Sequence, residues 1–296
     1  MPAPPGARAL PAALTAVLDL LRCPRCGEQL APTDGSLRCP VRHTFDVARA
    51  GYASLLTGTA ATSGDDDEMA RARDRFLDSG AYAPIRDLIT ELVVGHAEAR
   101  SAEGGSPTVL DVGCGTGYYL AGVLERLSSA RGLGLDTSTR ALRFAARAHE
   151  RAAAASWDVF APFPLRDAGV EVLLDVFAPR NPTEFARVLM PGGVLVVVRP
   201  APDHLAELRE VVPGMVSLDP HKEERLRRVL DPLFSTERTE ELRYPVDLST
   251  ASARDLVRMT PSARHVDAEQ LEASVPSEMT VTVSVVASSH RVLPEG

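Results

Sequence analysis

Three cysteines and one histidine near the N-terminus constrain this chain more than any other feature. They follow the pattern C-x2-C-x12-C-x3-H and are Cys23, Cys26, Cys39 and His43. Two tight turns would hold these side chains as two pairs, the arrangement of a closed tetrahedral zinc site. A disulfide or buried thiols would also explain paired cysteines, but the histidine completes a four-ligand set and favours zinc. Because four protein ligands leave no open position for water, we expect a structural Zn²⁺ ion, one per chain.

Composition limits the class of protein. The chain has 296 residues, 45% of them hydrophobic, enough for one catalytic domain and a small appended module. No stretch approaches the ~18 apolar residues of a membrane-spanning helix, and the N-terminus lacks the pattern of a signal peptide. Cysteines in a metal pattern indicate a reducing compartment. We therefore expect a cytoplasmic protein with no membrane partner.

Charge is distributed unevenly along the chain. The formal net charge of −8 argues against a protein that coats nucleic acid without specificity. Residues 1–50 nevertheless carry six arginines against four acids. A solvated surface or an RNA contact would each explain this small excess. The six are Arg8, Arg22, Arg25, Arg38, Arg42 and Arg49.

Strand-like and helix-like patterns alternate after residue 108. This alternation predicts an α/β fold, with a doubly wound parallel sheet and a ligand crevice at the carboxyl ends of its strands. Alternating Thr and Val over 279–287 predict a late antiparallel strand. Upstream, helical spacing over 69–99 breaks at Gly80 and Pro84, and the acidic run 65–68 is interpreted as a solvated loop or a helix start. The other expected strands are 109–112, 132–136, 156–159, 170–177 and 194–198, and the other helices are 118–127, 138–151 and 183–189.

A glycine-rich loop follows the first of these strands. Its form is D-x-G-x-G-x-G, built from Asp111, Gly113, Gly115 and Gly117. A dinucleotide fingerprint, G-x-G-x-x-G, would need glycine where Tyr118 stands. An acid at the strand end suits an amino-bearing ligand better than a pyrophosphate. The loop resembles that of class I S-adenosylmethionine (SAM)-dependent methyltransferases, although a nicotinamide dinucleotide remains the alternative.

Several residues then receive expected roles. Asp136, at the end of the second strand, would accept hydrogen bonds from both ribose hydroxyls of the cofactor. Gly113, Gly115 and Thr116 would line its methionine moiety through backbone groups. Asp158 either reaches the adenine or caps a turn. Asp175 is a weak candidate for a general base, and a buried hydrogen-bonded acid is the other interpretation.

Over most of residues 22–262 the chain resembles the bacterial 23S rRNA (guanine-N1)-methyltransferases. The zinc pattern carries part of this resemblance. Further motifs that match are Phe45-Asp46, Gly51-Tyr52, Gly64-Asp65, Glu68-Met69, Ala72-Arg73, Phe76-Leu77, Tyr82-x-Pro84, Gly117-Tyr118-Tyr119, Phe177-Ala178-Pro179, His204-Leu205 and Met259-Thr260-Pro261. The branch that it most resembles is that of the actinomycete macrolide-resistance enzymes, which includes tylosin resistance.

This resemblance implies a SAM-dependent enzyme that methylates N1 of a guanine in a 23S rRNA hairpin lining the peptide exit tunnel, with macrolide resistance as its role. It also implies a homodimer whose zinc modules help to grip the RNA, and it implies that Tyr82 and His204 close over the cofactor. The competing hypothesis is a small-molecule methyltransferase whose zinc module only braces the fold.

We therefore expect a class I (Rossmann-like) SAM-dependent methyltransferase domain with a small N-terminal zinc-binding module. The expected division is residues 1–20, a flexible N-terminus with a short helix; 21–56, a zinc-binding RNA-recognition module; 57–100, a linker with helices; and 101–296, the methyltransferase domain.

Overall fold

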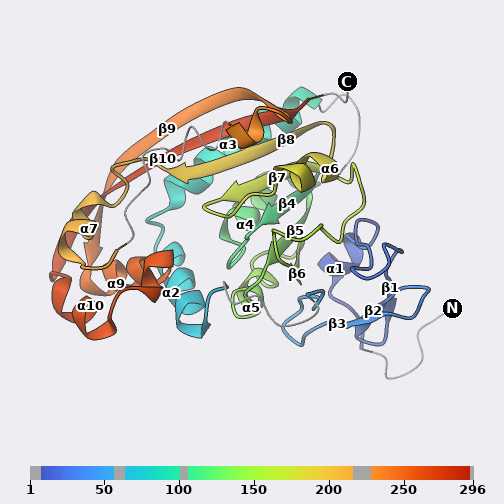
Figure 1. Cartoon of the computed structure of the whole chain (residues 1–296), viewed down its shortest axis with the longest axis horizontal. Coiled ribbons are helices and arrows are strands. Elements are labelled where there is room, and N and C mark those ends of the chain that lie inside the picture. Colours follow the sequence, from blue (N-terminus) through green and yellow to red (C-terminus); the bar gives the residue numbers. More distant parts are fainter. Residues whose placement is uncertain (1–7, 57–63, 101–105, 216–227, 294–296) are drawn as a thin grey trace.

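A seven-stranded sheet forms the centre of the molecule in the computed structural model, which describes residues 8–56, 64–100, 106–215 and 228–293 (Figure 1). The strand order is β6-β5-β4-β7-β8-β10-β9. The first five strands are mutually parallel, and β10 runs antiparallel to both β8 and β9. The order reverses between β4 and β7, and open α/β sheets bind their ligands outside the carboxyl ends of the strands at such a switch point.

The strands of this sheet have the following bounds: β4 Thr108–Val112, β5 Arg131–Asp136, β6 Ala152–Ser156, β7 Val170–Val176, β8 Leu189–Pro200, β9 Phe234–Ser249 and β10 Glu278–Val292. The helices around it are α2 Asp67–Asp78, α3 Ala83–Arg100, α4 Tyr118–Arg126, α5 Leu142–Ala145, α6 Pro182–Val188, α7 Ala206–Val211, α9 Thr250–Arg258, the 3-10 turn η2 Pro261–Arg264, and α10 Ala268–Ser274. In the described residues, no helix combines the length and apolarity needed to cross a bilayer.

Alternate side chains of each buried strand point to opposite faces of the sheet, and each face has its own core. On one face, Val109 and Val196 pack with α3, α4 and α9. On the other, Leu110 and Leu133 pack with the N-terminal segment and α6. The N-terminal module therefore takes the place of a covering layer on that second face.

The N-terminal module contains helix α1 (Ala12–Ala16) and a three-stranded antiparallel sheet, β1 (Ala31–Thr33), β2 (Ser36–Arg38) and β3 (Thr44–Asp46). A turn at Asp34-Gly35 joins β1 to β2. The module is joined to the large sheet by backbone bonds: Ala53 N–H donates to the Ala154 carbonyl at 2.9 Å, and Ser156 N–H donates to the Ala53 carbonyl at 2.8 Å. It is thus hydrogen-bonded to edge strand β6.

Two expected elements were placed wrongly. Of the helix predicted over 138–151, only α5 forms an α-helix. The strand predicted at 156–159 lies earlier in the chain, at β6. The cause is the run Ala152–Ala155, whose small side chains have high helix propensity but are buried here between β5 and the N-terminal module. The expected boundaries at 57 and 101 fall outside the described residues, as do residues 1–7.

Candidate metal centre and active site

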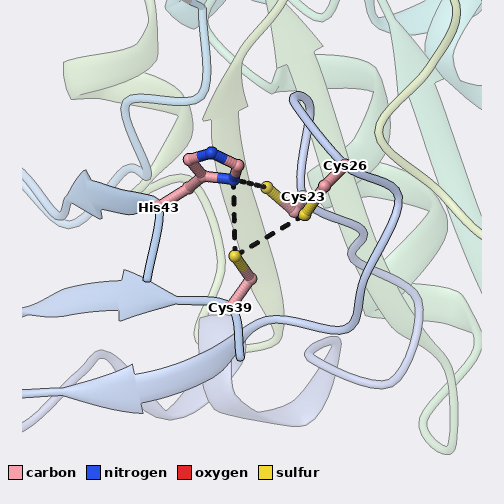
Figure 2. Close-up of side chains that lie close together, drawn as sticks. All are labelled: Cys23, Cys26, Cys39 and His43. Atoms are coloured by element: carbon pink, nitrogen blue, oxygen red, sulfur yellow. Dashed lines mark hydrogen bonds between the residues drawn. The ribbon is translucent and has the colours of Figure 1, made fainter. Parts of the chain in front are cut away.

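The four predicted metal ligands come together in the N-terminal module (Figure 2). Their ligand atoms all lie within 4.8 Å of one another. His43 Nδ1 is 3.4 Å from Cys23 Sγ and 3.6 Å from Cys39 Sγ, and Cys26 Sγ is 3.6 Å from Cys39 Sγ. These separations are too long for a disulfide, and they match the roughly 3.5–3.8 Å between ligands that zinc–sulfur bonds of about 2.3 Å impose on a tetrahedron. The residues fit a closed Cys3His zinc site.

Two tight backbone turns carry the ligands, as the pairing predicted. In the first, Gly27 N–H donates to the Cys23 carbonyl at 2.9 Å, and Gly27 has φ of 73°. In the second, Arg42 N–H donates to the Cys39 carbonyl at 2.9 Å, and Arg42 itself takes a left-handed φ of 71°. A non-glycine residue in this region is strained, so metal binding would help to hold the second turn.

The glycine-rich loop leaves the carboxyl end of β4 and enters α4. Gly113, Gly115 and Gly117 all have positive φ. A Cβ at Gly113 would lie 2.7 Å from Ala178 Cβ, and one at Gly115 would lie 3.1 Å from Arg73 Cδ. The backbone therefore approaches its neighbours too closely for side chains, and Thr116 in the same loop is buried. This is a backbone cradle of the kind that a nucleoside cofactor needs.

Asp136 ends β5 beside this cradle. Its carboxylate accepts a hydrogen bond from Gly115 N–H at 2.9 Å and another from Ser138 N–H at 2.7 Å. Burial raises the pKa of Asp136, while the two N–H donors oppose that rise. Because each carboxylate oxygen can accept a second bond, the pair of oxygens keeps capacity for two ribose hydroxyls.

Asp111 is 1% exposed, and its Oδ2 is buried with no hydrogen-bond partner. Burial, with the nearby Asp136 and Asp175 carboxyls, raises the pKa of Asp111 to about 8. A buried polar atom of this kind needs an explanation, and a ligand that bears a cationic amino group supplies one.

Asp175 lies in β7 and is fully buried. Arg180 Nε lies 3.1 Å from its Oδ2 as an ion pair. Asp175 is thus buried and ion-paired, and both of its interpretations, a hydrogen-bonded acid and a general base, stay predictions.

Tyr82 and His204 meet, although 122 positions separate them. His204 Nε2 lies 3.3 Å from Tyr82 Oη, and both residues are buried. Phe177, which follows β7 with a left-handed φ of 55°, stacks on His204 with ring centroids 6.0 Å apart. Phe177 is 39% exposed, so this cluster offers an aromatic face to solvent. Sequence patterns matched Phe177 but gave it no role.

Asp158 follows β6 and accepts a hydrogen bond from Phe160 N–H at 3.0 Å. This is the turn cap that was one of its two interpretations. The residue also stands at the carboxyl end of a strand next to β5, so an adenine contact stays a prediction.

Sequence reasoning gave no site role to Arg73 or to Asp65. Arg73 Nε donates to Asp65 Oδ2 at 2.8 Å, directly over the glycine loop. Asp66 caps α2 by accepting from Met69 N–H at 2.9 Å, so part of the acidic run is a helix start, as expected. The Ala72-Arg73 motif was the available signal, but only the fold shows that Arg73 faces the loop.

A hollow of about 500 Å³ opens where the zinc module meets the large domain. Arg22 and Arg25 come from the first zinc turn, and Arg166 and Arg187 come from the far side. Asp167 also lines it and pairs with Arg187 at 2.6 Å, and Glu184 accepts from Arg187 Nε at 2.9 Å, so the unbalanced positive charge comes from Arg22, Arg25 and Arg166. The lining therefore carries an excess of positive charge in an acidic protein.

Comparison with known proteins finds a matching family for the zinc module and another for the large domain. Residues 21–60 match the family described as "RlmA, N-terminal", a zinc ribbon, and residues 109–193 match a methyltransferase domain family. Over 94% of the chain, it is 44% identical to the Streptomyces fradiae 23S rRNA (guanine(748)-N(1))-methyltransferase, 99% of which is covered. The chain belongs to the 23S rRNA (guanine-N1)-methyltransferase family. This membership identifies SAM as the cofactor and the Cys3His cluster as a zinc ribbon site.

Two further relatives carry the name of the same enzyme family. A Micromonospora griseorubida protein named as a 23S rRNA (guanine-N(1)-)-methyltransferase is 42% identical over 93% of this chain and 98% of its own length. A Bacillus subtilis protein of that name is 31% identical over 92% and 98%. Family membership spans both the zinc module and the large domain, so the two form one architecture.

Proposed function

We propose that the protein transfers the methyl group of SAM to N1 of a guanine in 23S rRNA, in the hairpin that lines the peptide exit tunnel. The observation that carries this proposal is the end-to-end match to the Streptomyces fradiae enzyme, whose name specifies guanine 748. We infer the same position here. The expected consequence is resistance to macrolides of the tylosin type.

Bound SAM would supply an electrophilic methyl group on a sulfonium. The residues of the chain hold and orient it: Asp136 would bind the ribose hydroxyls, the loop Gly113–Gly117 would line the methionine end, and Asp111 would accept from its ammonium. Overall, SAM and the guanine would become S-adenosylhomocysteine and 1-methylguanine, and the proton of N1 would be released to solvent. The protein contributes chiefly the in-line placement of donor and acceptor.

Guanine N1 lies on the Watson–Crick edge, so the base must be unpaired or turned out of its helix before it can react. Stacking on an aromatic side chain stabilises a base that has been turned out of its helix. Phe177 is suited to this, because it follows β7 beside the cofactor strands and presents an exposed ring next to His204 and Tyr82.

The basic hollow at the zinc module is suited to the RNA backbone. Arginine guanidinium groups match phosphate geometry, and phosphate contacts position a protein on nucleic acid without reading sequence. The hollow contains arginines from both the zinc turn and the large domain, so one phosphate group could bridge the two. We further propose a homodimer, so that two such modules grip one RNA hairpin.

The test is methyl transfer from labelled SAM to unmodified 23S rRNA, followed by digestion to nucleosides. The proposal expects label in 1-methylguanosine. Asp136→Ala is the inactive comparison, and the exposed β9 variant Arg238→Gln is the matched control. Label that appears only in small molecules, with none in rRNA, would overturn the proposal and favour the small-molecule methyltransferase.

A further inference from the structure

Arg73 lies against the cofactor loop without an assigned role. It projects from α2, and a Cβ at Gly115 would lie 3.1 Å from its Cδ. Burial opposes the charge of Arg73, but the nearby Asp65, Asp136 and Tyr119 side chains together raise its pKa. The side chain is 26% exposed, so ligands can reach it. Arg73 thus lies against the glycine loop, with the ribose acid Asp136 within electrostatic range.

Two acceptors fix the guanidinium group in this place. Asp65 Oδ2 accepts from Nε at 2.8 Å, and the Met259 carbonyl accepts from Nη2 at 2.7 Å. These bonds use two of the five N–H groups of an arginine side chain. The other N–H groups of the guanidinium are able to donate to the two oxygens of a carboxylate.

Both acceptors are themselves anchored. The Asp65 carbonyl accepts from Ser138 Oγ at 2.6 Å, and Ser138 N–H also donates to Asp136. The Gly64 carbonyl accepts from Arg264 Nη2 at 2.7 Å. The segment before α2 is therefore tied both to the ribose acid and to η2.

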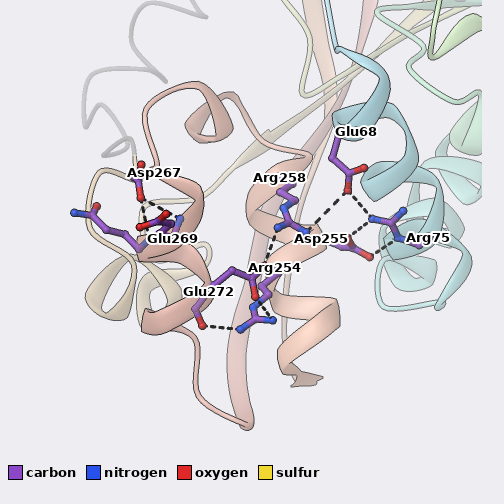
Figure 3. Close-up of polar contacts among 9 residues, drawn as sticks. Glu68, Arg75, Arg254, Asp255, Arg258, Asp267, Glu269 and Glu272 are labelled. Atoms are coloured by element: carbon purple, nitrogen blue, oxygen red, sulfur yellow. Dashed lines mark hydrogen bonds and ion pairs between the residues drawn. The ribbon is translucent and has the colours of Figure 1, made fainter.

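Met259 is fixed by the contact between α2 and α9, shown in Figure 3. Arg75 donates to both carboxylate oxygens of Asp255, at 2.9 and 2.6 Å, and its Nη2 lies 3.1 Å from Glu68 Oε1. Arg258 continues the network to Glu272 at 2.9 Å. Because Met259 directly follows α9, this network fixes its carbonyl relative to α2 and hence to Arg73.

The methionine end of SAM carries one ammonium and one carboxylate. Asp111 is suited to the ammonium, and a second, cationic group is needed for the carboxylate. We propose that Arg73 binds the α-carboxylate of SAM, and that Asp65 and the Met259 carbonyl hold Arg73 in position. This inference rests on the SAM cofactor and not on which base is methylated.

The experiment measures binding of two ligands by isothermal titration calorimetry, without RNA. Decarboxylated SAM keeps the sulfonium and the amine but lacks the carboxylate. Wild-type protein should bind SAM at least about tenfold more tightly than decarboxylated SAM, as a charge-assisted bidentate contact implies. Arg73→Met should weaken SAM by a similar factor and leave decarboxylated SAM within about threefold.

The matched control is Arg71→Met on the same helix, an exposed residue that forms an ion pair with Asp67 of that helix at 2.7 Å. It should leave both affinities unchanged. Equal affinity of wild-type protein for the two ligands would overturn the proposal. So would an equal loss of both ligands in Arg73→Met, because that result marks a purely structural arginine.

If Arg73→Met folds poorly, Arg73→Lys serves in its place, because lysine keeps the charge but lacks the planar guanidinium. Its preference for SAM over decarboxylated SAM should lie between those of wild-type protein and Arg73→Met. The wild-type comparison needs no variant, and equal affinity for the two ligands overturns the proposal whatever the variants show. Normal SAM discrimination with no methylation of rRNA would count against the proposed function and leave the role of Arg73 intact.

Discussion

His204 and Tyr82 form one buried hydrogen bond that joins the segment after β8 to the start of α3. Ser284 N–H donates to His204 Nδ1 at 3.1 Å. Nδ1 is therefore the acceptor, so in the neutral ring Nε2 carries the proton and donates to Tyr82 Oη at 3.3 Å. Burial raises the pKa of Tyr82, which keeps the phenol neutral.

Tyr82→Phe tests this contact. The ring would stay packed on Phe76, but the buried hydrogen bond would be lost, at a cost of about 1–2 kcal/mol of unfolding free energy. Denaturant unfolding followed by circular dichroism measures this loss. Tyr118→Phe, at a half-buried ring, should change stability by less than about 0.5 kcal/mol. Equal stability of the Tyr82 variant and wild type would show that the contact does not form.

SAM binding should depend on pH through Asp111. Its pKa of about 8 in the free protein lies far above the ordinary value. The carboxyl is then largely protonated at pH 6–7 and must lose its proton to bind the ammonium of SAM. Affinity should rise by up to about tenfold per pH unit toward pH 8, then fall as the amine of SAM, with a pKa of about 8, is deprotonated.

Calorimetric titration across pH 6–9 measures this profile, and proton release in buffers of different ionisation enthalpy confirms its origin. Asp111→Asn should bind SAM more weakly with a flatter rise below pH 8. The same linkage affects stability: a raised folded-state pKa stabilises the fold at low pH, and this contribution fades from about pH 4 to about pH 8. A pH-independent affinity in wild-type protein would contradict the ammonium contact.

Removing the metal should destabilise more than the zinc module. Cys23 and Cys39 belong to the same buried cluster as Leu110 and Leu133 of the central sheet. Chelation or Cys39→Ser should therefore lower the melting temperature of the whole protein, as structural zinc binding contributes folding energy directly. Metal analysis and differential scanning calorimetry check this. Cys114→Ser, outside the cluster, is the control and should retain one zinc ion per chain.

The basic hollow should contribute to RNA affinity and not to cofactor binding. Arg25→Gln and Arg166→Gln should each weaken binding to the rRNA hairpin and reduce the slope of log affinity against log salt by up to about 1. Filter binding at several salt concentrations measures both, with Arg238→Gln on β9 as control. An unchanged salt slope in both variants would place the RNA elsewhere.

Sequence patterns predicted those features whose signal lies in residues close together in the chain. The zinc spacing, the glycine loop with Asp136, and the buried strands β4, β5 and β7 each have a local signal. The strand Ala152–Ser156 has none, because alanine favours helix unless neighbours bury it.

Edge strand β9 was also missed. Its exposed, charged sequence and Pro245 resemble a loop, yet such residues protect the open edge of a sheet from further pairing. Contacts between distant residues were equally hidden, since Arg73 and Met259 lie 186 positions apart and meet only through packing of α2 on α9.

The most direct test of the central claim is reverse transcription of 23S rRNA from a susceptible host that expresses this protein. Methylation at N1 blocks base pairing, so the polymerase should stop next to guanine 748, and Asp136→Ala should abolish the stop. Full-length transcripts from cells that contain folded, zinc-loaded protein would contradict the account.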